Sequence, residues 1–192
     1  MRLFVAIDLS EDQRAEAARA AEVLQCALEN ARAPRAIRWV AHAALHLTVR
    51  FIGEVDDEHG GRIVAALAWP LEIAPFQLAF ERVGTFPGSG LPRVVWVGVG
   101  DGQRGVSAAH DGIDTRLTAL GVPSEARKFR PHLTLGRVRE IRRSQAAELV
   151  KAARGLRIDP APALVESLTL YRSYLSPKGP RYEPLTRTPL TG

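Results

Sequence analysis

Apolar and polar positions alternate in clear blocks from the first residues of the chain. Residues 2–9 form a short, mostly apolar run of strand length. The next four residues, Ser-Glu-Asp-Gln, have the pattern of a capping box, with Ser10 as the N-cap and Gln13 at the third helical position. Apolar residues then recur at helical spacing: Ala17, Ala21, Leu24 and Leu28. The pattern predicts a strand followed by a long helix that ends before Pro34.

The rest of the chain alternates between strand-like and helix-like patterns. Further strands are expected at 37–40, 45–55, 76–86, 93–100, 129–138, 163–176 and 182–190. Further helices are expected at 56–70, 104–120 and 143–153. Gly and Pro mark turns at 87–92 and 177–182. The order strand–helix–strand–strand–helix–strand therefore occurs about twice, which predicts an α+β protein with two related sheets, each backed by helices.

Length and composition are those of an ordinary globular domain. The 192 residues are 46% hydrophobic and 24% charged, enough to bury a sizeable core without cross-links. No apolar run has the length of a membrane span, and the N-terminus lacks the pattern of a signal peptide. The single cysteine, Cys26, excludes an intrachain disulfide, and we expect it to be packed within the first helix. We expect one two-lobed domain over residues 1–192, in the cytoplasm.

The net charge of +5 comes from 23 Arg and 3 Lys against 21 acidic residues. A basic balance suits a partner that carries phosphates, such as RNA. An Arg-rich and Ala-rich composition also follows from a GC-rich genome, whatever the function. Charge by itself leaves both explanations open.

The sequence His-Leu-Thr-aliphatic occurs twice, within residues 45–55 and 129–138. Each copy lies in a predicted strand, where alternate side chains point to opposite faces. His46 and Thr48 therefore share one face, and His132 and Thr134 share one face of the second strand. The aliphatic residues between them can enter a core while the polar pair lines a cleft.

Two imidazoles and two hydroxyls on one cleft are sufficient for cleaving a phosphodiester without a metal. A neutral His takes a proton from the attacking oxygen, and a protonated His gives one to the leaving oxygen. The ordinary His pKa of about 6.5 suits both tasks. Thr hydroxyls can donate to the phosphate oxygens, and an Arg can offset the charge of the transition state. The residues themselves leave open which His is the acid.

Other sequence features carry no chemistry. His42, His59 and His110 lack a Thr two residues later, and we expect them to be surface or capping residues. The sequence has no His-x-His, no His-Glu-x-x-His and no cysteine pair, so no metal site is predicted. The Gly-rich segment 98–105 fits neither a dinucleotide fingerprint nor a Walker loop, so no cofactor is expected.

The two motifs, in a chain of this length, resemble those of the two-histidine (2H) phosphoesterases. Within that group the chain is most similar to the bacterial and archaeal RNA 2′,3′-cyclic phosphodiesterases, long called 2′-5′ RNA ligases. The similar segments, in the expected order, are residues 2–9, 45–55, 92–99, 129–138 and 173–185. The resemblance thus spans nearly the whole chain.

The resemblance implies a two-lobed, pseudo-twofold fold. Each lobe would be an antiparallel sheet with helices outside, and the motifs would lie in the groove between the lobes. The implied reaction is metal-free and ATP-independent hydrolysis of RNA 2′,3′-cyclic phosphate ends to 2′-phosphomonoesters. By the same resemblance, His46 is the proton donor to the leaving 3′-oxygen, His132 is the base that activates water, and Thr48 and Thr134 bind the phosphate.

Two further residues are candidates for substrate binding. Arg130 stands two positions before His132, so strand alternation places it on the same face unless Pro131 distorts the chain. Tyr182 could stack on a terminal base or be an ordinary core or edge residue. The expected partner is an RNA end with a 2′,3′-cyclic phosphate, tRNA fragments among them, with no membrane involved. Nothing in the sequence requires more than a monomer.

Two alternatives remain at the level of sequence. Reversible 2′-5′ ligation of RNA halves would use the same acid–base pair and the same cyclic phosphate. A non-catalytic RNA- or nucleotide-binding module would need the basic charge and the groove, but would have no need for two titratable imidazoles.

Overall fold

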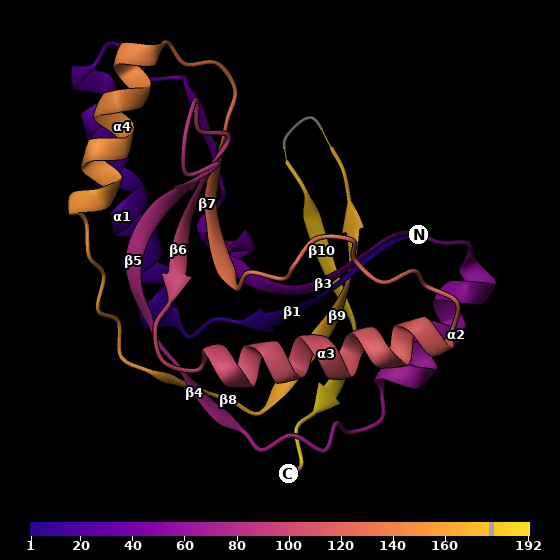
Figure 1. Ribbon diagram of the computed structural model, residues 1–192. Coiled ribbons are helices and arrows are strands. Elements are labelled where there is room, and N and C mark those ends of the chain that lie inside the picture. Colours follow the sequence, from indigo (N-terminus) through magenta and orange to yellow (C-terminus); the bar gives the residue numbers. More distant parts are fainter. Residues whose placement is uncertain (177–178) are drawn as a thin grey trace.

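The computed structural model describes residues 1–176 and 179–192 (Figure 1). Its larger sheet contains β1 (Arg2–Asp8), β2 (Ile37–Trp39), β3 (His46–Glu54), β5 (Phe80–Phe86), β6 (Val94–Val99), β7 (His132–Val138), β9 (Ser167–Tyr174) and β10 (Arg181–Pro189). A two-stranded sheet contains β4 (Phe76–Leu78) and β8 (Ala163–Val165). The helices are α1 (Glu11–Asn30), α2 (Asp57–Leu67), α3 (Gln103–Ala119) and α4 (Arg143–Gly155), with a short 3₁₀ turn η1 (His42–Ala44). The predicted α+β fold is confirmed.

The larger sheet consists of two half-sheets that meet at its centre. Its strand order is β10-β9-β1-β3-β7-β6-β5, with β2 also paired to β7. The pairings are antiparallel, and β3 joins β7 through the pair Leu47–Leu133. We call β1, β3, β9 and β10 the first half, and β2, β5, β6 and β7 the second half. Each half contains one His-Leu-Thr motif, in β3 and in β7.

The helices cross between the halves. Helix α1 follows β1 of the first half but packs on β7 and on α4, which itself packs on β5. Helix α3 follows β6 of the second half but packs on β3 of the first, beside α2 (Figure 1). Each half-sheet is therefore covered by a helix that follows, along the chain, a strand of the other half-sheet.

The start of α1 forms as its sequence predicts. The Ser10 side chain accepts a hydrogen bond from the Gln13 amide at 3.2 Å, and the Gln13 side chain accepts one from the Ser10 amide at 3.2 Å. This reciprocal capping box satisfies two amides that a helix start otherwise leaves unpaired. The fully buried Gln13 also donates to the Leu78 carbonyl at 2.8 Å, which ties α1 to β4.

The expectation that Cys26 is packed was wrong, because the thiol is exposed. Its position in α1 is as predicted. The buried face of that helix passes through Ala17, Ala20, Leu24 and Leu28. Cys26 lies two residues from both Leu24 and Leu28, and residues two apart on a helix point to different faces.

The long strands predicted at 76–86 and 163–176 are each broken. At Ala79 the backbone pairs with residues just after β6: its amide donates to Asp101, and its carbonyl accepts from Gly100. At Glu166 the carbonyl accepts from Leu190. The detached ends then pair with each other as β4 and β8. Because these breaks depend on partners distant in sequence, the local pattern did not reveal them.

The turn predicted at 177–182 falls in part outside the described residues, which omit 177 and 178. Strand β10 begins at Arg181, inside that predicted turn. The helices predicted at 56–70, 104–120 and 143–153 are present as α2, α3 and α4, with ends shifted by up to three residues. Among the described residues, no helix is long and apolar enough to cross a membrane.

The exchange of helices leads us to propose that residues 1–192 fold as one unit. We expect a single unfolding transition in urea, with the same midpoint by far-UV circular dichroism and by fluorescence of the three tryptophans. Fragments 1–88 and 89–192, made separately, should each lack a cooperative transition, because each contains only some strands of both half-sheets and lacks a helix that covers them. Two separate transitions in the intact chain, or a folded fragment, would contradict this.

Candidate active site

The two motifs face each other across the seam between the half-sheets. Leu47 and Leu133, the residues that pair there, are both fully buried and point into the core. Side chains alternate along each strand, so the motif residues on either side of the leucines point into the groove. Both expected pairs, one from each motif, thus reach the same surface.

The antiparallel register sets the order of the four polar groups. Continuing the Leu47–Leu133 pairing by one residue in each direction places His46 opposite Thr134 and Thr48 opposite His132. The imidazoles occupy one diagonal of this square and the hydroxyls the other. Diagonal neighbours in such a pair lie about 7–8 Å apart, which leaves room for one phosphate between the two rings.

Each imidazole is held by a backbone carbonyl two residues earlier. His46 Nδ1 lies 2.8 Å from the Ala44 oxygen, and His132 Nδ1 lies 2.7 Å from the Arg130 oxygen. A carbonyl can only accept, so Nδ1 carries the hydrogen in both rings. In the neutral form Nε2 then has a free lone pair, and in the protonated form it carries a proton that it can donate. The same ring can therefore act as a base or as an acid.

An aromatic ring meets each imidazole edge-on. Tyr182 lies 5.1 Å from His46 at an interplanar angle of 88°, and Phe86 lies 5.1 Å from His132, also at 88°. Phe4 packs against both His46, at 4.8 Å, and Tyr182, at 5.0 Å. These contacts fix the imidazole planes and remove water from one side of each ring.

A β-bulge follows the Thr of each motif. In β7 the partners of Thr134 and Gly136 are the adjacent residues Trp96 and Val95, so Leu135 is an extra residue. An extra residue reverses the alternation that follows it. Arg137 is thereby on the groove face, where simple alternation from His132 would place it in the core.

The corresponding bulge in β3 falls at Val49. Thr48 and Arg50 pair with the adjacent residues Ala6 and Val5. Phe51 then faces the groove and is 41% exposed, whereas Arg50 points inward and is only 3% exposed. The two strands thus have the same β-bulge after the motif Thr, and different side chains follow the bulge in each strand.

Unlike charges lie beside the two imidazoles. Asp8 is the cross-strand partner of His46, and Thr169 and Tyr171 each donate to its carboxylate, at 2.8 and 2.5 Å. Burial lowers the pKa of His46, and the bond to the Ala44 carbonyl and the Asp8 charge oppose that shift. Asp8 therefore favours the protonated form of His46.

At the second imidazole the neighbouring charge has the opposite sign. Burial lowers the pKa of His132. The bond to the Arg130 carbonyl opposes that shift, and the Arg137 guanidinium adds to it. Arg137 therefore favours the neutral form of His132, whereas Asp8 favours the protonated form of His46.

A hollow of about 1400 Å³ opens beside the second motif. The predicted site residues that line it are Thr48, His132, Thr134 and Arg130, and Arg137 lines it as well. His46 and Tyr182 contact each other and belong to the adjoining aromatic cluster with Phe4. Arg130 precedes the first residue of β7, so the carbonyl bond to His132, and not strand alternation, fixes its backbone there.

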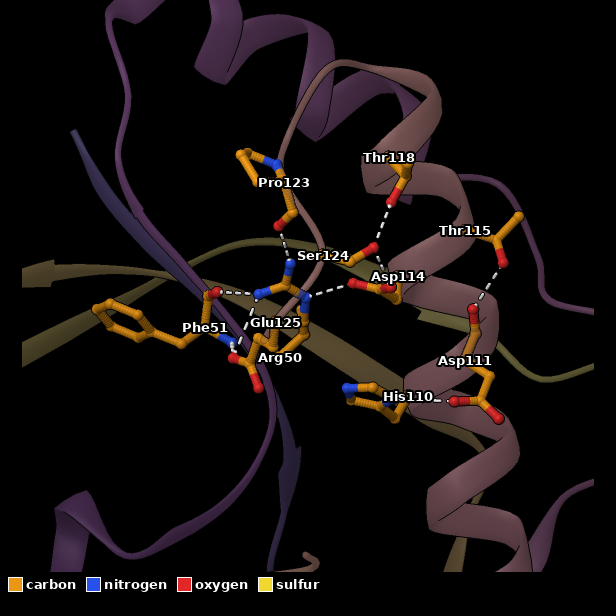
Figure 2. A network of polar contacts seen from close by, with 10 residues as sticks. All are labelled: Arg50, Phe51, His110, Asp111, Asp114, Thr115, Thr118, Pro123, Ser124 and Glu125. Carbon is orange, nitrogen blue, oxygen red and sulfur yellow. Dashed lines mark hydrogen bonds and ion pairs between the residues drawn. The ribbon is translucent and has the colours of Figure 1, made fainter. Parts of the chain in front are cut away.

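Buried Arg50 joins the first motif strand to the segment before the second motif (Figure 2). Its guanidinium donates to Asp114 of α3 at 2.7 Å and to the Pro123 carbonyl at 2.5 Å. It also lies 3.2 Å from the Glu125 carboxylate. Ser124 donates to the second oxygen of Asp114 at 2.8 Å. Residues 123–125 are therefore fixed against β3 and α3.

The other histidines lie outside this groove arrangement. His42 is on the surface, 3.4 Å from Glu11. The amide of His59 is capped by Asp56 at the start of α2. His110 differs from the expectation of a surface or capping residue: its side chain is 12% exposed and stacks on Phe129 at 4.2 Å.

Sequence reasoning missed Asp8, Arg50 and Arg137. Asp8 could have been found from its position at the end of an apolar strand. A charged side chain next to buried residues usually has a polar partner. Gly136 was a weaker signal, since an isolated Gly in a strand pattern suggests a bulge. For Arg50 the local sequence offered no signal, because its partners lie about 64 to 75 residues away.

Comparison with known proteins gives one consistent family. The profile of the 2′-5′ RNA ligase superfamily matches residues 10–176. The RNA 2′,3′-cyclic phosphodiesterase of Methanocaldococcus jannaschii is 33% identical over 184 residues, which cover 95% of this chain and 97% of the relative. The protein of the same name from Aeropyrum pernix is 36% identical over 141 residues, covering 73% and 78%.

Solved structures agree with the observed fold. TT0787 of Thermus thermophilus superposes with a TM-score of 0.75 at 29% identity, covering 98% of this chain and 97% of that one. LigT of E. coli, complexed with 3′-AMP, superposes with a TM-score of 0.69 at 29% identity, covering 100% and 98%. The expected arrangement of two related antiparallel half-sheets is therefore shared with these proteins.

The Arg50 network predicts a pH-dependent loss of stability for Asp114→Asn. Burial alone would raise the pKa of Asp114, but hydrogen bonds from Ser124 and Arg50 and the Arg50 charge outweigh it, so the pKa is lowered. A lowered folded-state pKa stabilises the fold above the unfolded-state pKa, and this is lost as the pH falls through the folded value. At pH 7 the variant should lose about 1–3 kcal/mol of unfolding free energy.

Urea unfolding at several pH values measures this effect. The difference between wild type and Asp114→Asn should shrink as the pH falls through the lowered folded-state pKa of Asp114, because the wild-type carboxyl then becomes protonated. Glu148→Gln, on the exposed face of α4, is the control and should change stability little at any pH. A deficit in Asp114→Asn that does not vary with pH would contradict the proposed cause.

Proposed function

The chain belongs to the 2′-5′ RNA ligase superfamily, and we propose that it is an RNA 2′,3′-cyclic phosphodiesterase. It hydrolyses the cyclic phosphate at an RNA 3′ end to a 2′-phosphomonoester. The observation that carries this proposal is the Leu47–Leu133 pairing of β3 with β7, whose register brings two imidazoles and two hydroxyls to one face. The names of the curated relatives, several at 30–36% identity over most of their length, support it.

The proposed reaction needs one proton taken and one proton given. His132 Nε2 removes a proton from water as the water oxygen attacks phosphorus. The bond from phosphorus to the 3′-oxygen breaks, and protonated His46 gives its Nε2 proton to that oxygen. The products are a 2′-phosphate and a 3′-hydroxyl. His132 ends protonated and His46 neutral, so exchange with solvent restores the starting pair.

The charges beside the rings support this assignment of roles. Asp8 favours the imidazolium that a proton donor must be, and Arg137 disfavours it at the ring that must accept a proton. The assignment from resemblance, with His46 as acid and His132 as base, therefore has an independent electrostatic argument. The anionic substrate would add to the effect of Asp8 and further oppose the lowering of the His46 pKa by burial.

The remaining groove residues would bind the phosphate. We infer that Thr48 and Thr134 donate to its non-bridging oxygens, since both lie on the groove face beside the rings. Arg137 would offset the charge that develops in the transition state, and Arg130 would approach from the same hollow. Tyr182, packed edge-on to His46, would present its remaining edge to a terminal base.

We further propose that the protein acts as a monomer on RNA ends, tRNA fragments among them. Both motifs come from one chain, so a second copy is not needed to complete the site. The exposed single thiol, Cys26, suits the reducing cytoplasm. Attack by the 5′-hydroxyl of a second RNA in place of water would open the same ring and give a 2′-5′ linkage, with the same base and the same acid. A purely RNA-binding protein would have no need for carbonyl-fixed imidazole tautomers.

His46→Ala and His132→Ala should each reduce the rate of hydrolysis by about 10²–10⁴-fold, the usual contribution of a positioned acid or base. The test incubates purified protein in EDTA, without ATP, with a short RNA that ends in a 2′,3′-cyclic phosphate. Mass spectrometry identifies the product, and resistance to a 3′-phosphatase distinguishes a 2′-phosphate. His42→Ala, at the surface, is the matched control and should retain wild-type activity.

Near wild-type rates in either motif variant would refute the proposal, provided that circular dichroism shows the fold to be intact. Addition of an RNA with a 5′-hydroxyl in the same assay tests the ligase alternative through a joined product. Tight binding of RNA without turnover by the wild type would favour the binding module.

Asp8→Asn should move the alkaline limb of the kcat/KM profile to lower pH. Removing the carboxylate lowers the pKa of His46, so the proton donor is lost at a lower pH. The acidic limb, set by His132, should stay in place. A shift of the acidic limb instead would mean that His46 is the base and His132 the acid. Measuring kcat/KM between pH 4 and pH 9 distinguishes the two outcomes.

A further inference from the structure

The hollow beside the second motif extends well beyond the three motif residues that line it, Thr48, His132 and Thr134. At about 1400 Å³ it exceeds the roughly 300–1,000 Å³ of pockets that hold one small molecule. Its far walls are the turn between β5 and β6, the end of β7 with residues 139–141, and the segment 125–130. A single cyclic phosphate and its nucleoside would leave much of this space unfilled.

Cations predominate on the walls of the hollow. The positively charged residues that line it are Arg93, Arg127, Lys128, Arg130, Arg137 and Arg139. The acidic residues that line it are Glu125 and Glu140, and Glu125 is already paired with Arg50. Arg127 and Lys128 come before β7 and Arg139 follows its last residue, and all three are exposed. The excess of positive charge is therefore larger than one phosphate requires.

Aromatic faces lie among these cations. Phe51 lines the hollow, is 41% exposed, and has the Arg2 guanidinium 4.9 Å from its ring centre. Phe129 lines it too, with one face covered by the His110 ring. Aromatic rings and guanidinium groups interleaved along a positive groove are the surface on which single-stranded nucleic acid stacks its bases and places its phosphates.

The basic segment 125–130 is fixed at both ends. Arg50 holds its start through Pro123 and Glu125, and the stack of His110 on Phe129 holds its end. Arg127 and Lys128 lie between these two anchors. A segment ordered before binding loses less conformational entropy when a ligand arrives. Burial of the Arg50 charge costs free energy. In return, Arg50 fixes the start of the segment that carries Arg127 and Lys128.

We propose that this hollow binds the RNA strand on the 5′ side of the terminal nucleotide. The inference rests on the proposed function. A cyclic phosphate occupies the 3′ end of an RNA, so every other nucleotide leaves the reaction centre in one direction. Arg127, Lys128 and Arg139 contact backbone phosphates, and Phe51 and Phe129 stack bases. The enzyme therefore prefers an oligonucleotide to a cyclic mononucleotide, with little dependence on base sequence.

The first test compares two substrates with the same reactive end. The kcat/KM is measured for a nucleoside 2′,3′-cyclic monophosphate and for an RNA hexamer ending in the same nucleotide and cyclic phosphate. The hexamer should be favoured by about tenfold or more at low salt, and its advantage should decline as salt rises, because phosphate contacts release counterions. Equal values at every salt concentration would overturn the proposal.

The second test uses paired charge variants. Arg127→Ala/Lys128→Ala should reduce the ratio of hexamer to mononucleotide kcat/KM by about tenfold, and should lower the salt slope for the hexamer by about 1.4, or 0.7 for each lost phosphate contact. The control Arg62→Ala/Lys151→Ala removes the same charge from exposed positions on α2 and α4 outside the hollow. It should leave the ratio at the wild-type value.

The outcomes separate the two levels of the proposal. Turnover of both substrates without a length preference, or an equal effect of the two double variants, would overturn the strand-binding surface and leave the phosphodiesterase intact. No turnover of either substrate by the wild type would instead refute the proposed function itself.

Discussion

The pairing of Leu47 with Leu133 is the contact on which the site depends. Both leucines are fully buried, so the register of β3 against β7 is set by their demand for the core. A slip of one residue in either strand would bury an imidazole and a hydroxyl and expose a leucine. Helices α1 and α3 oppose such a slip. Each follows a strand of one half-sheet and packs on the other half-sheet, so the two halves are tied together.

The two bulges show how one backbone device yields different functions in two related strands. Each adds one residue directly after the motif Thr and so reverses the faces beyond it. In β7 the reversal places Arg137 in the groove. In β3 it places Phe51 in the groove and Arg50 inside, where it reaches α3 and the segment before the second motif. The two motif strands therefore share a backbone bulge but place side chains of different chemistry in the groove.

The hydrophobic pattern and the repeated motif predicted most helices and strands and the shared face of His46 and Thr48. Those features depend on local periodicity, which the sequence displays directly. The face of Arg137 was not predictable in this way, because a bulge is defined by the pairing of β7 with β6. The breaks at Ala79 and Glu166 also depend on distant backbone partners. Sequence reasoning therefore succeeded for features that depend on the periodicity of a single strand. It failed for features that depend on how that strand pairs with its neighbour.

Two identical histidines can serve as acid and base only if something makes them unequal. In a symmetric setting both imidazoles would have the same pKa. A single proton shared between them would then be found equally often on either ring. Burial lowers the pKa of both rings, and on that common shift Asp8 acts to raise the pKa of His46 while Arg137 acts to lower that of His132. In the proposed reaction, His132 is protonated after turnover beside the Arg137 guanidinium, and His46 is neutral beside the Asp8 carboxylate. Under that proposal, the charges that favour the reactive arrangement also favour its restoration by proton exchange with solvent.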